Sequence, residues 1–200
     1  MRQRDLDRYA TLMGEVRMRI ETSNDLISGR TRTTYIQTNV ESICLQIRKT
    51  LELVAFGSLV CHREEYSNVR AITNDWHASR ILKAVEKINP DFYPRAVRGW
   101  VGPDRYGKYK LARFRGMQLT RIQFTALYDR CGNHLHAQNP FATSKSSTAF
   151  LKDAPSMIQR LRGLLSEHVV TLPQGKDFLW VQVPQDANLP IKVQHVSELP

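Results

Sequence analysis

The sequence predicts a mainly α-helical protein of the α+β class, in which a bundle of about five helices precedes a small C-terminal antiparallel β-sheet. Apolar residues recur at steps of three and four through most of the first 167 residues, which is the helical period. From residue 168 the period becomes that of extended strands. A chain of 200 residues forms one main core and is too short for two large domains. We therefore expect a helical bundle over 1–167 and a β extension over 168–200.

Two long helices are predicted, one on each side of Gly29. An apolar stripe from Leu6 to Ile27 predicts the first helix over roughly 3–28, and Gly29 ends it. A second stripe starts after the residues TRTT and predicts a helix that reaches His62. The second half of this helix, LELVAFGSLV, is apolar nearly all round, which is typical of the central helix of a bundle.

Glu52 interrupts the apolar surface of that second helix. Arg48 lies one turn before Glu52, so the two side chains can form an ion pair. One interpretation is a structural ion pair inside the bundle, and the other is a polar strip that faces an active site. The sequence leaves both interpretations open.

Two more helices are predicted from their caps and stripes. A third helix is expected over 74–88, with Thr73 or Asn74 as its N-cap. The last helix is expected to hold Pro155 in its first turn, where the missing amide hydrogen costs little, and to run to about residue 167.

Between them, a fourth helix is predicted to begin after Thr120, which is a favoured N-cap. Ile122, Phe124 and Leu127 are expected to point inward. Glycine in a helix interior costs roughly 1 kcal/mol relative to alanine, so we expect the helix to break at Gly132.

A basic segment at 95–115 is expected to form a loop between the third and fourth helices. It holds seven Lys and Arg residues and one acid, so it carries a net charge of +6 out of +10 for the chain. Aromatic residues alternate with these cations, which suits contacts to phosphates and to the faces of unstacked bases. The alternative is a solvated loop that its aromatic side chains hold against the core. The candidate nucleic-acid-binding residues are Arg95, Arg98, Arg105, Lys108, Lys110, Arg113, Arg115, Trp100, Tyr106 and Tyr109.

Three strands are predicted near the C-terminus from the segments HVVTLP, DFLWVQVP and LPIKVQHV. The turn-forming stretches PQGK and QDAN separate them, so the strands should form an antiparallel sheet. The role of this sheet is open among a lid, a brace across the bundle and a dimer contact.

The stretch YDRCGNHLHAQNPF, residues 128–141, carries the side chains that best suit phosphate chemistry. Arginine binds phosphate oxygens as a fork and histidine titrates near neutrality, so Arg130 and His136 are the candidate catalytic pair. In one continuous helix the two would lie about 120° apart and roughly 9 Å along the axis. They would reach one phosphate only if the helix loosened at Gly132 or if two copies of the segment met. The supporting candidates are His134, Asn139, Arg48 and Glu52.

The segment RCGNHLHA, Arg130 to Ala137, resembles the motif of the HEPN superfamily, in which an arginine is followed four to six residues later by histidine and a small residue. The segment IRKTLELVAFGSL is similar to the central helix of such bundles, and the likeness covers roughly 35–140. The resemblance implies a metal-independent endoribonuclease. Arg130 would hold the scissile phosphate, and His136 would be the general base on the 2′-hydroxyl. Cleavage would leave a 2′,3′-cyclic phosphate and would often depend on two protomers whose motifs face each other.

Spacing alone does not identify this motif, because the pairs Arg70–His77 and Arg162–His168 match it as well. Only the 130–136 match combines a late position in the helical region with a small residue after the histidine. The residue after the arginine is usually polar in active members, whereas here it is Cys131.

Several other classes of protein are disfavoured by the sequence. It contains no phosphate-binding glycine loop, no histidine and acid cluster at metal-ligand spacing and no set suited to a Ser or Cys nucleophile, so we expect no cofactor and no metal. It has no apolar run long enough to span a membrane and no signal peptide. The three cysteines form no CxxC pair. We therefore expect a cytoplasmic protein with reduced thiols.

Two functions are compatible with these features. The first is a HEPN-like ribonuclease that acts on RNA as a homodimer. By family habit it would serve as a bacterial phage-defence or toxin component, with an antitoxin or larger complex as partner. The alternative is a helical nucleic-acid-binding, dimeric assembly or regulatory module without catalysis.

Overall fold

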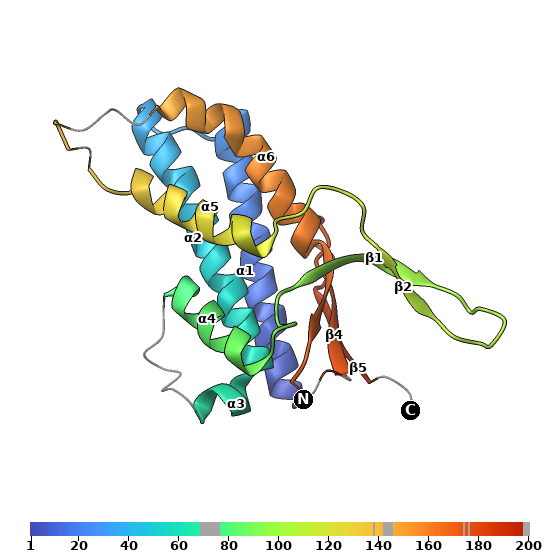
Figure 1. The fold of residues 1–200 in the computed structure, drawn as a ribbon. Coiled ribbons are helices and arrows are strands. Elements are labelled where there is room, and N and C mark those ends of the chain that lie inside the picture. The colour runs from blue at the N-terminus through green and yellow to red at the C-terminus, as the bar shows by residue number, and fades with distance from the viewer. Residues whose placement is uncertain (69–76, 138, 142–145, 174, 176, 198–200) are drawn as a thin grey trace.

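The helices form a bundle in the computed structural model, which describes residues 1–68, 77–137, 139–141, 146–173, 175 and 177–197. Figure 1 shows α1, α2 and α6 side by side, with α4 and α5 packed on α2. This arrangement confirms the mainly helical prediction. The helices are α1 (Gln3–Ser28), α2 (Ile36–Cys61), α3 (Arg63–Ser67), α4 (Ala78–Ile88), α5 (Arg121–His134) and α6 (Ser147–Leu165).

A five-stranded antiparallel sheet lies beside the bundle, with strand order β2-β1-β3-β4-β5. Its last three strands are those predicted near the C-terminus. The first two come from the basic segment 95–115, which was expected to be a loop and instead forms a hairpin. The strands are β1 (Arg95–Val101), β2 (Lys110–Arg113), β3 (Glu167–Thr171), β4 (Asp177–Gln182) and β5 (Lys192–Ser197). Strand β1, from inside the expected bundle segment 1–167, thus pairs with β3 in the expected β extension.

The predicted helix boundaries agree with the structure where caps and breakers are strong. Both long N-terminal helices lie within a residue of their expected ends. The side chain of Thr120 accepts a hydrogen bond from the Gln123 amide at 3.3 Å, and the Thr120 amide donates to the Gln123 side-chain oxygen at 3.1 Å. This reciprocal capping box confirms the start of α5. The expected caps of α4, Thr73 and Asn74, lie outside the described residues.

Two predictions for α5 are wrong. Ile122 is 85% exposed, because it lies about 200° around the helix from the buried Phe124 and so faces away from α2. Phe124 and Leu127 are buried as expected. The helix also passes through Gly132 without a break and ends at His134. Because glycine has no side chain, the Arg48 guanidinium can pack directly against the helix at this position. A Cβ on Gly132 would lie 2.5 Å from a guanidinium nitrogen of Arg48.

The start of α6 also differs from the prediction. The helix begins at Ser147, with the Ser146 hydroxyl accepting from the Ala149 amide at 3.1 Å, so Pro155 lies in its interior rather than in its first turn. The turns before the proline hold Phe150 and Ala154, which are fully buried. Burial of this apolar stripe offsets the hydrogen bond that the proline cannot donate.

Two buried histidines connect the helices to strand β3. His168 on β3 lies 2.8 Å from the Tyr9 hydroxyl of α1 and 3.0 Å from the Leu165 carbonyl oxygen. A carbonyl only accepts, so Nδ1 of His168 carries the proton and Nε2 accepts from Tyr9. His62 is arranged in the same way, with Nδ1 on the Ser58 carbonyl and Nε2 accepting from Asn89. Asn89 also donates to the Thr171 carbonyl of β3 at 3.0 Å, so both histidines are neutral members of the core.

Gly163 sets the distance between α6 and the chain that leads into α5. A Cβ at this position would lie 1.9 Å from the Met117 carbonyl oxygen, which is backbone and cannot turn away. The Leu119 amide donates to the Arg160 carbonyl beside it at 2.9 Å. This close crossing fixes where α5 begins relative to the hairpin.

Within the described residues, no helix has both the length and the apolar character needed to cross a membrane.

We predict that Gly163→Ala lowers the free energy of unfolding by roughly 2–3 kcal/mol, because the methyl group forces two backbones apart. Gly14→Ala on α1 is the matched control, since nothing lies within 4 Å of its new Cβ. That change should raise the free energy of unfolding by up to about 1 kcal/mol. Urea unfolding of the three proteins measures both effects. Equal stability of Gly163→Ala and wild type would contradict the crossing.

We also predict that acid destabilises the fold through His168. Burial lowers the pKa of His168 to about 4 from an ordinary value of 6.5. The neutral ring therefore contributes stability that is fully present above about pH 6.5 and is lost as the pH falls toward 4. Between pH 7.5 and pH 5 the loss through this one group should be about 2 kcal/mol. Urea unfolding of wild type and His168→Gln at both pH values should show a smaller loss in the variant, and an identical loss would refute the assignment.

Candidate nucleic-acid interface

Arg130 and His134 share one face of α5, directed toward α6. The Arg130 guanidinium donates to the Asp153 carboxylate at 2.7 Å and lies 5.4 Å from the centre of the Phe150 ring. The His134 ring packs against the same Phe150, with 4.8 Å between ring centres. Both candidates thus meet on one buried aromatic side chain. The Asp153 carboxylate was not predicted as a partner, since nothing in the sequence places it opposite α5.

His136 lies on the exposed chain two residues beyond the end of α5. The Leu135 amide closes the helix by donating to the Gly132 carbonyl at 3.1 Å. Because α5 does not loosen at Gly132, one protomer offers no break that would swing His136 toward Arg130. Asn139 is exposed too, and its side chain accepts from the Phe141 amide at 3.0 Å.

Cys131 has a packing role between α5 and α2. It is fully buried, and its thiol shares a hydrogen bond with the thiol of Cys44, which together with burial raises the pKa of Cys44. All three cysteines are buried free thiols, as predicted. The contact of Cys131 with Cys44 between α5 and α2 therefore accounts for a thiol at position 131.

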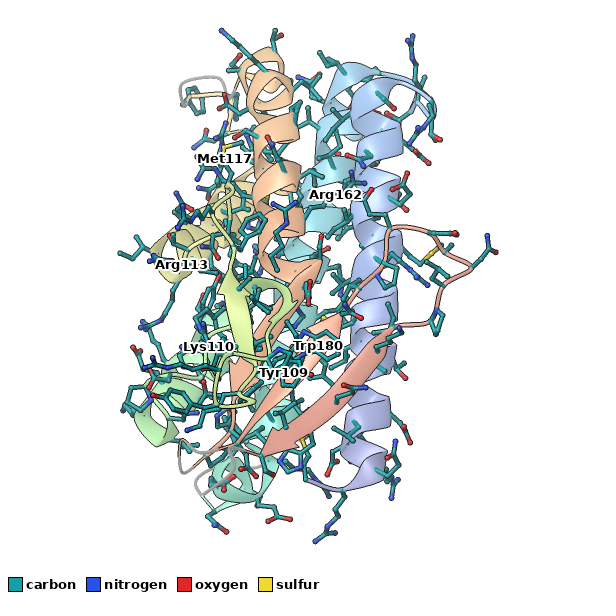
Figure 2. The ribbon with its side chains drawn as sticks, turned by 90° about the vertical axis from the view of Figure 1, so that its right-hand side faces the viewer. Tyr109, Lys110, Arg113, Met117, Arg162 and Trp180 are labelled. Carbon is teal, nitrogen blue, oxygen red and sulfur yellow. The ribbon has the colours of Figure 1, made fainter. Side chains whose placement is uncertain are left out.

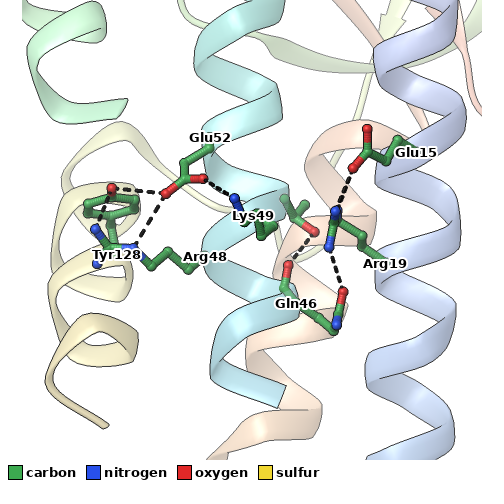
Figure 3. A network of polar contacts seen from close by, with 8 residues as sticks. Glu15, Arg19, Gln46, Arg48, Lys49, Glu52 and Tyr128 are labelled. Atoms are coloured by element: carbon green, nitrogen blue, oxygen red, sulfur yellow. Dashed lines mark hydrogen bonds and ion pairs between the residues drawn. The ribbon is translucent and has the colours of Figure 1, made fainter. Parts of the chain in front are cut away.

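Arg48 and Glu52 meet on a third residue, Tyr128 of α5 (Figure 3). Arg48 donates to the Tyr128 hydroxyl at 2.6 Å, and its guanidinium lies 3.9 Å from the ring centre. The hydroxyl donates to the Glu52 carboxylate at 3.2 Å, while Arg48 and Lys49 approach that carboxylate at 3.4 and 3.5 Å. The pair predicted from spacing is present, and it connects α2 to α5 on the face of Gly132.

Tyr128 keeps its proton in this network. Burial raises the pKa of Tyr128 above its ordinary value, and the Glu52 carboxylate raises it further. The hydroxyl therefore serves as donor to Glu52 and acceptor from Arg48 at once. Sequence reasoning did not single out Tyr128, although it lies four residues before Gly132 and so on the same helical face.

The basic hairpin, residues 95–115 with β1, β2 and their connecting turn, projects from the body of the molecule (Figure 1). Each of its seven cationic residues is exposed. Tyr106 and Tyr109 are 71% and 61% exposed, so these two aromatic residues do not hold the segment against the core. Trp100, 39% exposed, packs on rings of β4, and Phe114 packs beside Gly163.

Asp104, the acid of this segment, shapes the turn. Its carboxylate accepts from the amides of Tyr106 and Lys108 at 2.9 and 3.0 Å. The Lys108 amide, and after it the Tyr106 amide, lowers the pKa of the Asp104 carboxyl group. The Asp104 carboxylate is therefore directed at the backbone of the turn. In the same turn, the Arg105 guanidinium lies 4.7 Å from the centre of the Tyr106 ring.

The described part of the chain contains no group of three or more His, Cys, Asp or Glu residues that could hold a metal ion.

The structure also bears on the two other Arg-to-His pairs that match the motif spacing. His168 is fully buried against Tyr9, so the Arg162–His168 match is not an exposed site. Arg70 lies outside the described residues. Compared with protein-family models, curated proteins and solved structures, the chain gives no match, so the account of its site rests on its own residues.

Proposed function

We propose that this protein binds RNA and that the basic hairpin is its principal contact surface. The observation that carries the proposal is the exposure of all seven cationic residues together with Trp100, Tyr106 and Tyr109 on one projecting hairpin. Cations neutralise phosphates and exposed aromatic rings stack on bases, so the hairpin offers both kinds of contact.

Charge distribution supports this assignment. The hairpin segment carries +6 of the net +10 of the chain, and its one acid is turned toward backbone amides. A projecting basic element concentrates the positive potential and attracts polyanions from solution. The resemblance of the helical region to HEPN ribonucleases favours RNA over DNA as the polyanion.

A second candidate function is metal-independent cleavage of RNA by Arg130 and His136. The observation that favours it is their access to solvent: Arg130 pairs with a carboxylate that is itself 53% exposed, which an incoming phosphate can displace. His136 would take the proton of the 2′-hydroxyl, the 2′-oxygen would attack phosphorus, and the 5′-oxygen would leave with a proton from solvent. Since α5 is continuous, Arg130 and His136 of facing protomers would act together.

We predict that Arg113→Gln with Arg115→Gln weakens RNA binding and flattens its salt dependence. If both side chains touch phosphates, the slope of log affinity against log salt for a single strand should fall in magnitude by about 1.4. Arg4→Gln with Arg32→Gln is the charge-matched control, because both residues are exposed and lie outside the hairpin. Fluorescence anisotropy over a salt series measures the slope. An unchanged slope for the hairpin variant would remove this surface from the interface.

The cleavage candidate predicts that wild-type protein cuts mixed RNA in EDTA and leaves 2′,3′-cyclic phosphate ends. His136→Ala should slow cutting by at least about 100-fold, as expected on loss of a general base, and Arg130→Ala should also slow it. His195→Ala, on strand β5, is the control and should cut normally. Equal cutting by wild type and His136→Ala, or none by wild type, would reject catalysis at this pair.

A further inference from the structure

Three aromatic side chains gather on the outer face of the sheet. Trp100 of β1 lies 6.4 Å from Phe178 and 6.0 Å from Trp180 of β4, measured between ring centres. Trp100 is 39% exposed, and the two β4 rings are half-buried. Sequence reasoning missed Phe178 and Trp180, although alternation in DFLWVQV places both on one face of a strand.

The two faces of β4 differ as this alternation requires. Leu179 and Val181 are fully buried in the core, so Phe178 and Trp180 lie on the opposite, outer face of the sheet. Trp180 is directly opposite Val169 on one side and Gln194 on the other. The indole N–H donates to the Glu167 carboxylate at 2.9 Å, which fixes the orientation of the ring. The Glu167 carboxylate is thereby paired with one of the three aromatic side chains.

A bend in β1 brings the basic hairpin next to these rings. The register between β1 and β2 shifts between Val97 and Trp100, and Gly99 within this bulge has φ +65°, a conformation that favours glycine. Trp100 therefore reaches across β3 to β4. Figure 2 shows the outer face of the sheet, with Trp180 beside the hairpin that carries Tyr109 and Lys110.

Exposed cations flank the aromatic cluster on the same face. Arg95 is directly opposite Val169, which is in turn opposite Trp180, so these side chains share one row across the sheet. Lys192 is opposite Gln182, two residues along β4 from Trp180, and so lies on the outer face as well. Both cations are exposed. An apolar face bordered by cations complements a ligand that has flat rings and negative charges.

We propose that Trp100, Phe178 and Trp180 form a platform on which unpaired bases of RNA stack, while the hairpin and the flanking cations hold the phosphates. The inference rests on the proposed RNA binding and adds a substrate class, namely single-stranded rather than duplex RNA. Bases in a duplex are already stacked on one another and cannot lie on side chains. Aromatic platforms of this kind accept any base, because every base has a π face.

The test compares binding of a labelled oligouridylate and of a blunt RNA duplex by anisotropy at one salt concentration. Trp100→Ala with Phe178→Ala should weaken binding of the single strand by at least about tenfold. Binding of the duplex should change less than about twofold. Tyr35→Ala is the matched control, because Tyr35 is an aromatic residue 57% exposed at the start of α2, outside the sheet. It should bind both RNAs as wild type does.

A second measurement avoids any loss of folding in the double variant. In a Trp76→Phe background, Trp100 and Trp180 are the remaining tryptophans, and oligouridylate should quench their fluorescence in a saturable way. Absence of quenching, or equal weakening of both RNAs by the double variant, would overturn the platform. A dimer in light scattering that Trp100→Ala dissociates would also overturn it, since a second copy would then cover the face.

The platform and the proposed RNA binding fail in different ways. If neutralising Arg113 and Arg115 flattens the salt slope while the aromatic variants bind the single strand normally, the hairpin binds RNA and the platform is wrong. If wild-type protein binds neither RNA, both proposals are wrong. Loss of single-strand binding alone supports the platform.

Discussion

Strand β1 pairs with β3 at Arg95 and Ala96 and with β2 from Val97 onward, and this sharing determines the surface of the molecule. The first pairing holds the strand to the sheet, and the second extends it into the hairpin. Within the second pairing the bulge at Gly99 turns the chain, so one strand belongs to both the sheet and the projecting hairpin. The position of the hairpin cations that follow Gly99, relative to the aromatic face, depends on this turn.

The sheet is in turn held to the helices through polar groups as well as apolar ones. Tyr9 and His168 link α1 to β3, while His62 and Asn89 link α2 to the carbonyl of Thr171. Buried polar groups are costly when unpaired, so these contacts favour one placement of β3 over others. Because β1 pairs with β3, the helical core indirectly places the hairpin. The basic hairpin and the buried histidines are therefore parts of one arrangement.

Local signals in the sequence predicted much of this fold. The stripe of α1, the Thr120 N-cap and the alternation in the last three strands each depend on residues close together in the chain, and the structure confirms them. Wrong predictions arose where distant residues decide. Gly132 does not break α5, because Arg48 packs against it, and buried residues extend α6 upstream of Pro155.

The candidate site shows the same division. Exposure of the cations and aromatic residues in 95–115 agrees with the binding interpretation. The attachment of this hairpin to the sheet, however, depends on the pairing of Arg95 and Ala96 with β3, more than 70 residues away. The ion pair of Arg48 and Glu52 follows from helical spacing, whereas its contact with Tyr128 depends on how α5 packs on α2. The contact of Asp153 with Arg130 could not be predicted either, because it depends on how α6 packs beside α5.

The proposed path takes a single RNA strand across the basic hairpin and the aromatic face of the sheet. Ultraviolet cross-linking of the protein to oligouridylate, followed by mass spectrometry of the peptides, tests this path directly. We expect cross-linked nucleotides on peptides that contain Trp100, Tyr106 or Tyr109 and on the peptide that contains Phe178 and Trp180. Cross-links confined to the helices, with none in β1, β2 or β4, would contradict it.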